Sequence, residues 1–375
     1  MKPAKYFMRT SPEMAVPWED LAGLGPFSLA KDEKRNLYRV ALSELTRGHY
    51  QNCPPYRLIL DAQGLAPRPG IEPEPEDQPL LPVRLFKELE LLSVPRESVT
   101  RVMTSSGTSG QAVSRIFLDK DNARRQSQVL ARIICSFIGR GRLPLLLMDT
   151  ESVRRDPALY SARGAGLFGF LPFGTEICYA LNEDMSLNRP RLKAFLEKHG
   201  RGTVLMFGYT AIIWRHVFQE MEEAGETVNL KDGILFHSGG WKKMKDQAVD
   251  AAIYNETAGK LFGRIRIHNY YGLAEQLGSV FVECEKGYMH CSIYSEALVR
   301  RARDFAPAGF GERGVLELMS LIPTSYPGHI LLTEDEGEIL GEDDCPCGRL
   351  GRYFKIHGRI RGAELRGCSD TYERP

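Results

Sequence analysis

The stretch Thr104-Ser105-Ser106-Gly107-Thr108-Ser109-Gly110 decides how the rest of the sequence is interpreted. It contains no charged or bulky side chain, and segments typical of β-strands flank it at 98–103 and 116–118. Glycine lets backbone N–H groups approach an anion closely, and rotatable hydroxyls add donors for phosphate oxygens. No Gly-Lys-Ser/Thr ending follows, so the loop differs from a Walker-type P-loop. We interpret it as a nucleotide phosphate loop, and the alternative is a Ser/Gly surface turn.

Composition excludes several classes of protein. The 375 residues carry a formal net charge of +1, which argues against a protein that binds nucleic acid. No apolar run approaches the roughly 18–20 residues of a membrane span, and the first seven residues lack the apolar core of a signal peptide. We therefore expect a cytoplasmic protein without integral membrane association. Its eight cysteines are then expected to be reduced, metal-bound or catalytic.

Short apolar runs alternate with helical patterns through the middle of the chain. The runs that predict buried strands are 145–148, 204–207, 233–236 and 265–267. The segments that predict helices between them are 121–138, 189–199, 210–224 and 246–261. This alternation predicts an α/β fold with mixed or parallel sheets flanked by helices, and shorter strands after Gly309 predict an added β-rich subdomain.

The N-terminal part of the chain has a different pattern. Residues 31–62 carry an apolar stripe that predicts a helix, and prolines alternate with acids over 65–82, which predicts an exposed, extended connector. The units expected are an N-terminal helical region with its connector (1–82), an α/β nucleotide- and acyl-binding core (83–308), a β-rich subdomain (309–357) and a short C-terminal tail (358–375).

Three further elements at strand ends extend the candidate nucleotide site. An aromatic pair beside glycine, Tyr270-Tyr271-Gly272, can flank a purine, and Glu275 just beyond can hold Mg²⁺ on a phosphate. Ser238-Gly239-Gly240 forms a turn at another strand end, where α/β sheets bind ligands. The carboxylate of Asp335 can accept hydrogen bonds from ribose hydroxyls. The alternatives are a solvated helix-start carboxylate for Glu275 and a turn acid for Asp335.

Two apolar segments are candidates for the lining of a substrate channel. Phe207-Gly208-Tyr209 ends a predicted strand, and we assign it as the segment that binds the apolar part of the substrate. The stretch 164–169 fits the dinucleotide pattern G-x-G-x-x-G, but no β-branched strand precedes it and Pro172 follows closely. We interpret that stretch as a close-packing or substrate-channel segment.

Cysteine and histidine spacing predicts a metal site. Cys345 and Cys347 form a tight thiol pair, and Cys284 lies six residues before His290 on a predicted hairpin. Four N/S ligands suit tetrahedral Zn²⁺ with no open position, which makes the site structural. Cys291 competes with His290 as the fourth ligand, and the alternative to zinc is a set of reduced, partly buried cysteines.

Taken in order, these elements resemble the adenylate-forming ligases. Within that superfamily the chain is most similar to the acyl-protein synthetases (long-chain-fatty-acid–luciferin-component ligases), and more distantly to the phenylacetate–CoA ligases. Almost the whole chain carries the closer resemblance, including residues 49–53, 81–87 and 366–370. The resemblance implies that the 104–110 loop holds ATP phosphates, that Tyr271-Gly272 and Glu275 contact adenine and Mg²⁺, and that Asp335 binds ribose.

Two features depart from the usual superfamily pattern. Many relatives carry a lysine just after the loop, where this chain has Gln111-Ala112-Val113-Ser114, and Lys242 or Lys243 is a candidate substitute. Only about sixteen residues follow Gly358-Arg359, the usual junction to a C-terminal lid domain with a catalytic lysine. We therefore expect that domain to be truncated, as it is in the acyl-protein synthetases.

Cys368 is the candidate acyl acceptor. Nearby arginines such as Arg366 favour its thiolate, and the resemblance implies that it takes the acyl group as a thioester. We expect ATP-dependent, AMP-forming activation of a fatty acid, with Arg359 neutralising charge, and then transfer through Cys368 to an acyl-CoA-reductase-type partner. The alternatives are an aryl- or acyl-CoA ligase and a non-catalytic nucleotide-binding scaffold.

Overall fold

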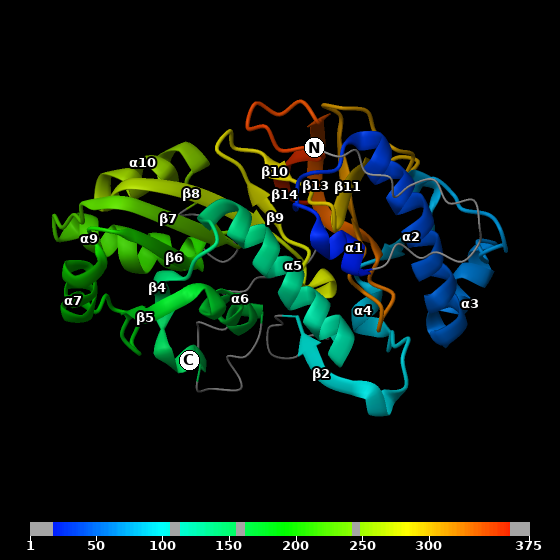
Figure 1. Ribbon diagram of the computed structural model, residues 1–375, viewed down its shortest axis with the longest axis horizontal. Helices are drawn as coiled ribbons and strands as arrows, with labels where there is room; N and C mark the ends of the chain where they lie inside the picture. Colours follow the sequence, from blue (N-terminus) through cyan, green and yellow to red (C-terminus); the bar gives the residue numbers. More distant parts are fainter. Residues whose placement is uncertain (1–17, 106–112, 155–161, 242–247, 361–375) are drawn as a thin grey trace.

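A single mixed sheet organises the computed structural model, which describes residues 18–105, 113–154, 162–241 and 248–360. The sheet has 12 strands, ordered β5-β4-β6-β7-β8-β9-β10-β14-β13-β12-β11, and β1 (Leu81–Pro82) pairs in parallel with β13. Figure 1 shows its parallel half in green, its antiparallel half in yellow to red, and helices against both. The predicted α/β class with a mixed, helix-flanked sheet is confirmed.

Continuous apolar runs at 145–148, 204–207 and 233–236 form the centre of the parallel half, because strands covered on both faces exclude polar side chains. All four residues of the run 145–148 are fully buried. The parallel strands are β4 (Leu143–Thr150), β5 (Gly174–Leu181), β6 (Thr203–Tyr209), β7 (Leu230–Ser238) and β8 (Gly263–Tyr271). The helices of this half are α5 (Lys120–Ile138), α6 (Ala162–Phe170), α7 (Arg189–His199), α8 (Thr210–Ile213), α9 (Gln219–Glu223) and α10 (Ala251–Phe262).

The antiparallel half begins at β9, upstream of the predicted change at Gly309. Its strands are β9 (Phe281–Glu283), β10 (Met289–His290), β11 (Ser295–Arg300), β12 (Arg313–Ser320), β13 (Ile330–Glu342) and β14 (Arg352–Arg359). Hydrogen-bonded pairing continues from β8 through β9 and β10 to β14. The sheet is therefore continuous across residue 308, and the division into four units stays a prediction.

Helices α2 and α3 lie against the antiparallel half (Figure 1). The single helix predicted over 31–62 is divided at Cys53, because Pro54 cannot donate a backbone hydrogen bond within a continuous helix. The remaining elements of this region are α1 (Trp18–Gly23), α2 (Lys31–Asn52), α3 (Pro54–Gln63), α4 (Leu85–Glu88) and the separate hairpin of β2 (Val99–Thr104) and β3 (Arg115–Asp119).

The proline-rich segment is not the fully exposed connector that the sequence predicted. Pro75 and Gln78 are buried, and the acids between the prolines pair with α2. Arg39 donates to Glu72 at 2.5 Å, and Arg35 donates to Glu76 at 2.6 Å. The prediction failed because basic partners about forty positions upstream compensate the acidic charges.

Helix α6 contains the glycine-rich stretch 164–169. A Cβ at Gly166 would collide with the hydroxyl of Tyr209, and a Cβ at Gly169 would lie 3.0 Å from Leu130 Cδ2. Glycine at these positions therefore allows α6 to approach its neighbours closely, in agreement with the close-packing interpretation. Among the described helices, none combines the length and apolar character required to cross a membrane.

Candidate functional site

The predicted phosphate loop connects the two strands of the β2–β3 hairpin. Most of it, residues 106–112, lies outside the described ranges. At its described base, the Ser105 N–H donates to the Ser114 carbonyl oxygen at 3.1 Å, and the Ser114 N–H donates to the Ser105 hydroxyl at 2.9 Å. These hydrogen bonds close the loop directly beyond Thr104, the last residue of β2.

Glu275 lies in the connection between β8 and β9 and faces the base of this loop. Only 7% of the residue is exposed, and burial raises the pKa of its carboxyl, against the opposing effects of the Ser114 hydroxyl and the Arg359 charge. No cationic side chain of the described ranges lies within ion-pair distance of it. A buried carboxylate in this position fits Mg²⁺, which prefers oxygen ligands.

The neighbouring Gln276 fixes the position of this connection. Its side-chain amide donates to the carbonyl oxygens of Leu318, at 3.1 Å, and Gly328, at 2.8 Å. A Cβ at Gly328 would lie 2.7 Å from the Glu275 carbonyl oxygen. Backbone of the antiparallel half therefore supports the segment that carries Glu275.

Four side chains from β8, β13 and β14 form a second group, the Arg359 cluster, which consists of Tyr271, Glu334, Asp335 and Arg359. The Tyr271 hydroxyl donates to Asp335 Oδ2 at 2.6 Å, and Arg359 Nε lies 3.2 Å from Asp335 Oδ1. Arg359 Nη1 also donates to Glu334 Oε2 at 2.7 Å. Burial and the Asp335 charge raise the pKa of Tyr271 well above its usual value. Three residues predicted separately from the sequence thus lie together.

Tyr270 points away from that cluster because side chains alternate along a strand. Its ring lies 5.9 Å from the Phe207 ring. Strand pairing aligns Tyr209 with Ser238, and Ser238 with Tyr270, across the carboxyl ends of β6, β7 and β8. At the adjoining turn, Gly239 has φ 81°, a conformation that glycine adopts without strain. This row of strand ends is where open α/β sheets bind ligands.

The predicted acyl-binding residues are tightly packed. Phe207 is fully buried and stacks on Phe170 with ring centroids 4.0 Å apart. A Cβ at Gly208 would lie 3.0 Å from both Ile213 Cγ1 and Met148 Cβ. The Tyr209 hydroxyl donates to the Arg163 carbonyl oxygen at 3.0 Å. Their role in acyl binding stays a prediction.

A third group, the thiol cluster, consists of Cys284, His290, Cys345 and Cys347. The ligand atoms of these residues all lie within 4.8 Å of one another. The β9–β10 hairpin supplies the first two, and the connection from β13 to β14 supplies the others. The sequence thus identified four side chains that the fold does bring together.

Arg349 compensates charge beside the thiol cluster. Burial opposes ionisation of Cys347, but backbone and side-chain donors of Arg349 outweigh that effect and lower the pKa of this thiol. The Arg349 guanidinium also donates to Glu285 at 2.7 Å and lies 4.2 Å from the Phe137 ring centroid. This arginine therefore links the thiol cluster to α5.

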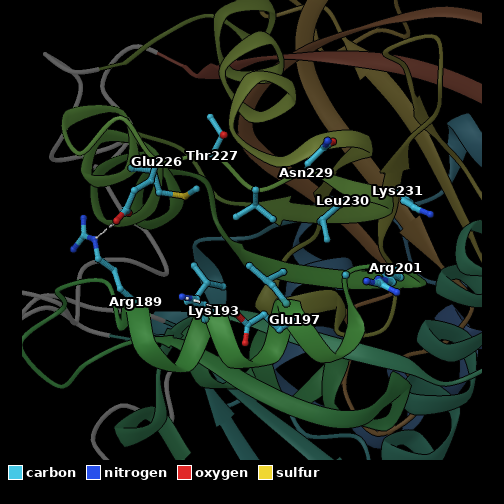
Figure 2. Close-up of a pocket in the computed structure, with 14 residues that line it drawn as sticks. Arg189, Lys193, Glu197, Arg201, Glu226, Thr227, Asn229, Leu230 and Lys231 are labelled. Carbon is cyan, nitrogen blue, oxygen red and sulfur yellow. Dashed lines mark hydrogen bonds and ion pairs between the residues drawn. The ribbon is translucent and has the colours of Figure 1, made fainter.

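A separate cavity of about 670 Å³ lies between α7 and the start of β7. Figure 2 shows Arg189 paired with Glu226 at one side of it, and Arg201 and Lys231 at the other. Leu230 in its wall begins β7, whereas Ser238 ends that strand. Eight residue steps at about 3.3 Å each put roughly 26 Å between this cavity and the predicted nucleotide site.

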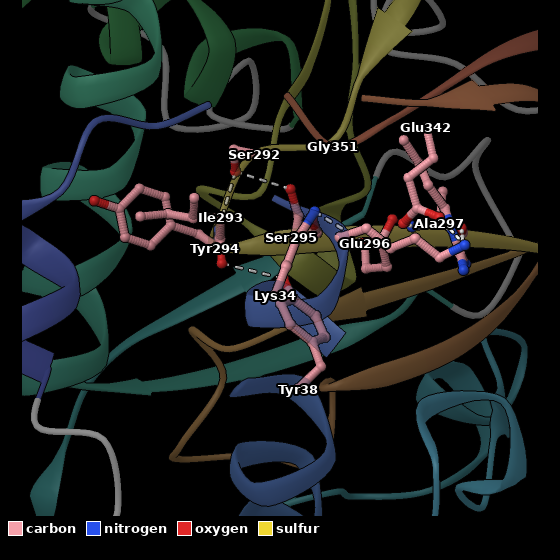
Figure 3. Close-up of polar contacts among 12 residues, drawn as sticks. Lys34, Tyr38, Ser292, Ile293, Tyr294, Ser295, Glu296, Ala297, Glu342 and Gly351 are labelled. Carbon is pink, nitrogen blue, oxygen red and sulfur yellow. Dashed lines mark hydrogen bonds and ion pairs between the residues drawn. The ribbon is translucent and has the colours of Figure 1, made fainter. Parts of the chain in front are cut away.

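Sequence reasoning missed several residues that support these clusters. Ser114 and Glu334 are two of them, and closeness in sequence to Gly110 and Asp335 was the available signal. Lys34 is a third, and it lies in a buried network. The Lys34 Nζ lies 2.9 Å from Glu296 Oε2 and 3.0 Å from the Ser295 carbonyl oxygen. Figure 3 shows Lys34 extending from α2 toward Glu296 on β11. Cys368, Lys242 and Lys243 lie outside the described residues.

The fold defines the class of protein. Its solved neighbours include 2-hydroxyisobutyryl-CoA ligase in an open conformation with 2-HIB-AMP and CoA, at a TM-score of 0.67 and 18% identity, covering 90% of this chain and 77% of that one. A second structure of that ligase, in the postadenylation state, matches with a TM-score of 0.66. The fold is therefore that of the adenylate-forming ligases.

The sequence comparisons identify the family. The model for the acyl-protein synthetase family LuxE matches residues 19–374, and the chain belongs to that family and is an AMP-forming ligase. A long-chain-fatty-acid–luciferin-component ligase of Vibrio harveyi is 24% identical, with 94% of this chain and 91% of the relative covered. A phenylacetate-coenzyme A ligase of Thermus thermophilus is 26% identical, with 90% and 74% covered.

Proposed function

We propose that the chain activates a fatty acid with ATP, takes the acyl group on Cys368 as a thioester, and delivers it to a partner acyl reductase. Family membership supports the adenylation step, and similarity to the long-chain-fatty-acid–luciferin-component ligase of Vibrio harveyi supports a long-chain fatty acid. The single observation that carries the site is the convergence of Glu275, the base of the 104–110 loop and the Arg359 cluster.

In the first step, the carboxylate oxygen attacks the α-phosphorus of ATP, the bond to the β-phosphate breaks, and pyrophosphate leaves. Mg²⁺ bound near Glu275 would neutralise phosphate charge in this step. Asp335 would accept hydrogen bonds from the ribose, and Arg359, held by Asp335 and Glu334, would face the α-phosphate. Positioning and charge neutralisation supply most of the rate enhancement in such a transfer.

In the second step, the Cys368 thiolate attacks the acyl carbon of the adenylate, and AMP leaves as the carbonyl re-forms. Cys368 follows β14 by nine residues in the sequence. Since the strand ends at Arg359, the segment that carries the thiol begins beside the proposed nucleotide site. A thioester keeps the acyl group activated for a reductase.

The experiment measures both steps in one preparation. ATP–pyrophosphate exchange is screened over fatty and aryl acids, and labelled acid with ATP should leave label that survives denaturation and is released by neutral hydroxylamine. Cys368→Ser should retain exchange and lose the label, whereas Cys135→Ser on α5 should retain both. Label persisting in Cys368→Ser would assign another acceptor.

Two other results would favour the alternative functions. Acyl-CoA formation by a chain that never becomes labelled would favour a CoA ligase, which the phenylacetate-coenzyme A ligase relative makes the main alternative. Failure of every carboxylic acid to support ATP–pyrophosphate exchange, by a folded chain that still binds ATP, would favour a nucleotide-binding scaffold.

A further inference from the structure

We propose that the thiol cluster binds one structural Zn²⁺ through three cysteine sulfurs and His290 Nε2. Zinc lies about 2.3 Å from sulfur and about 2.0–2.1 Å from nitrogen, so a tetrahedron separates two sulfurs by roughly 3.8 Å and a sulfur from a nitrogen by roughly 3.6 Å. Cys284 Sγ and Cys345 Sγ lie 3.9 Å apart, and Cys347 Sγ and His290 Nε2 lie 3.3 Å apart. These two separations lie within about 0.3 Å of the tetrahedral values, and all four atoms lie within 4.8 Å of one another.

The backbone around two of the ligands supplies independent support. Gly287 N donates to the Cys284 carbonyl oxygen at 2.9 Å, and Gly348 N donates to the Cys345 carbonyl oxygen at the same distance. These glycines have φ values of 78° and 81°. Two regions about sixty residues apart thus each close a turn from a cysteine carbonyl oxygen to the N–H of a glycine three residues later.

Donor chemistry and burial select the metal and its role. Cys284, His290 and Cys345 are each at most 4% exposed, so no coordination position is open to a substrate. Thiolate and imidazole donors in a closed tetrahedral set favour zinc over magnesium or calcium. Three thiolates with Zn²⁺ carry a net charge of −1, and the Arg349 guanidinium, which also pairs with Glu285, lies beside that charge.

The geometry also distinguishes His290 from Cys291, which the sequence left as competitors. The His290 ring packs between Phe27 and Tyr353 with its Nε2 toward Cys347. Cys291 follows on the strand, where its N–H donates to the Arg352 carbonyl oxygen and its thiol lies beside Glu296. Alternation along the strand therefore directs His290 into the cluster and Cys291 out of it.

Such a site joins two hairpins at one end of β14. Cys284 and His290 hold the β9–β10 hairpin, and Cys345 and Cys347 precede β14, which pairs with β10 through Tyr353 and His290. The metal would thereby fix the register of a strand whose other end carries Arg359. It would contribute folding energy and no catalytic step.

The first test is elemental analysis of the purified full-length chain, with X-ray absorption at the zinc edge. We expect one zinc per chain, with three sulfur neighbours at about 2.3 Å and one nitrogen at about 2.0–2.1 Å. Chelation under reducing conditions should lower Tm by at least about 5 °C, and added zinc should restore it. Metal-free protein of full stability, or a Cys284–Cys345 disulfide found by mass spectrometry, would overturn the proposal.

Variants test the ligand set independently of activity. Cys345→Ser and His290→Gln should each lower the zinc content below one half, whereas Cys291→Ala should retain one zinc. If the first two do not fold, Cys347→Ser at the more exposed edge provides the same measurement. Zinc lost from Cys291→Ala and retained in His290→Gln would refute the assignment. Since zinc content is measured without ATP or acid, failure of the proposed ligase activity leaves this test unaffected.

Discussion

The two ends of β14 differ in the charges that surround them and in their exposure to water. At its start, the thiol cluster gathers three thiols and an imidazole with no cation among them, and three of the four side chains are buried. At its end, the Arg359 cluster pairs a guanidinium with two carboxylates and remains partly exposed. One end suits a permanently bound ion, and the other suits a ligand that exchanges.

Because of this contrast, we expect residues near one end of β14 to affect stability and residues near the other end to affect turnover. Groups near the start of β14 should affect unfolding and leave the chemistry per folded molecule unchanged. Groups near its end should affect ATP use and leave unfolding nearly unchanged. Substitutions near the two ends of β14 test whether stability and turnover separate in this way.

The largest effect is expected from Glu296→Gln, near the start of β14. Glu296 neutralises Lys34, whose side chain is 3% exposed, and Arg352 at the start of β14 adds to the same field. Removing one partner of a buried pair leaves an uncompensated charge and should cost about 3–5 kcal/mol of unfolding free energy. Urea denaturation measures the loss.

A matched exposed pair provides the control for that measurement. Lys193 and Glu197 lie 3.9 Å apart on α7 with side chains 77% and 68% exposed. Glu197→Gln should change the unfolding free energy by less than about 0.5 kcal/mol. Equal effects of the two substitutions would mean that burial does not determine the cost.

Glu275→Gln should have the opposite phenotype. The substitution removes the proposed Mg²⁺ ligand, so acid-dependent pyrophosphate exchange should fall on the order of 10²-fold or more. Stability should not decrease, because burial already disfavours the charge of this carboxylate. Near-normal exchange by the folded variant would contradict the assignment, and Glu256→Gln on the exposed face of α10 is the control.

Acid should destabilise the protein through a third buried group, His49, which lies away from both ends of β14. The His49 ring contacts His329, Tyr56, Ser93 and the Pro323 carbonyl oxygen, and burial lowers the pKa of His49 to about 4. Its contribution to stability is therefore complete above pH 6.5 and is lost as pH falls through about 4, up to about 3 kcal/mol. Denaturation of wild type and His49→Gln from pH 7.5 to 4.5 should show a smaller pH slope for the variant; equal slopes would contradict this origin.

The smallest effect is expected from Asp335→Asn. The substitution removes the charge that holds Tyr271 and Arg359 and that would contact ribose, so KM for ATP should rise about tenfold while kcat changes little. Steady-state exchange kinetics separate the two constants. Asp232→Asn, near the opposite end of the sheet, should change neither, and a fall in kcat alone would place Asp335 in the chemical step instead.

The sequence predicted β4, β6 and β7 because each contains a continuous apolar run, as at 204–207 and 233–236. It located β8 only at 265–267, where Arg266 interrupts the apolar residues, and it did not predict β5. It located the antiparallel half less well. β9 and β10 have only three and two residues, too few for a recognisable period, and β10 pairs with β14, more than sixty residues away. Short strands of this kind are determined by tertiary contacts.

The site shows the same division between local and distant information. Motifs such as those of Tyr271 and Asp335 could be recognised because each stands next to a short apolar run, which is a local pattern. The structure places Tyr271 as the last residue of β8 and Asp335 within β13. The pairing of Lys34 with Glu296 could not be predicted, because the sequence of a helix does not indicate which residue of a distant strand will contact it. The residues proposed to carry the chemistry were therefore more predictable than the residues that hold the elements in place.

The attachment of α2 to β11 also affects how the chain is made. Lys34 contacts Ser295, a residue 261 positions later. At a synthesis rate of about 5–20 residues per second, α2 emerges from the ribosome roughly 13–50 s before its partner strand exists. During that interval its apolar side chains, Leu37 and Leu42 among them, have no sheet to cover them. The newly made N-terminal helices are thus a natural substrate for chaperones, and slower translation would lengthen their exposure.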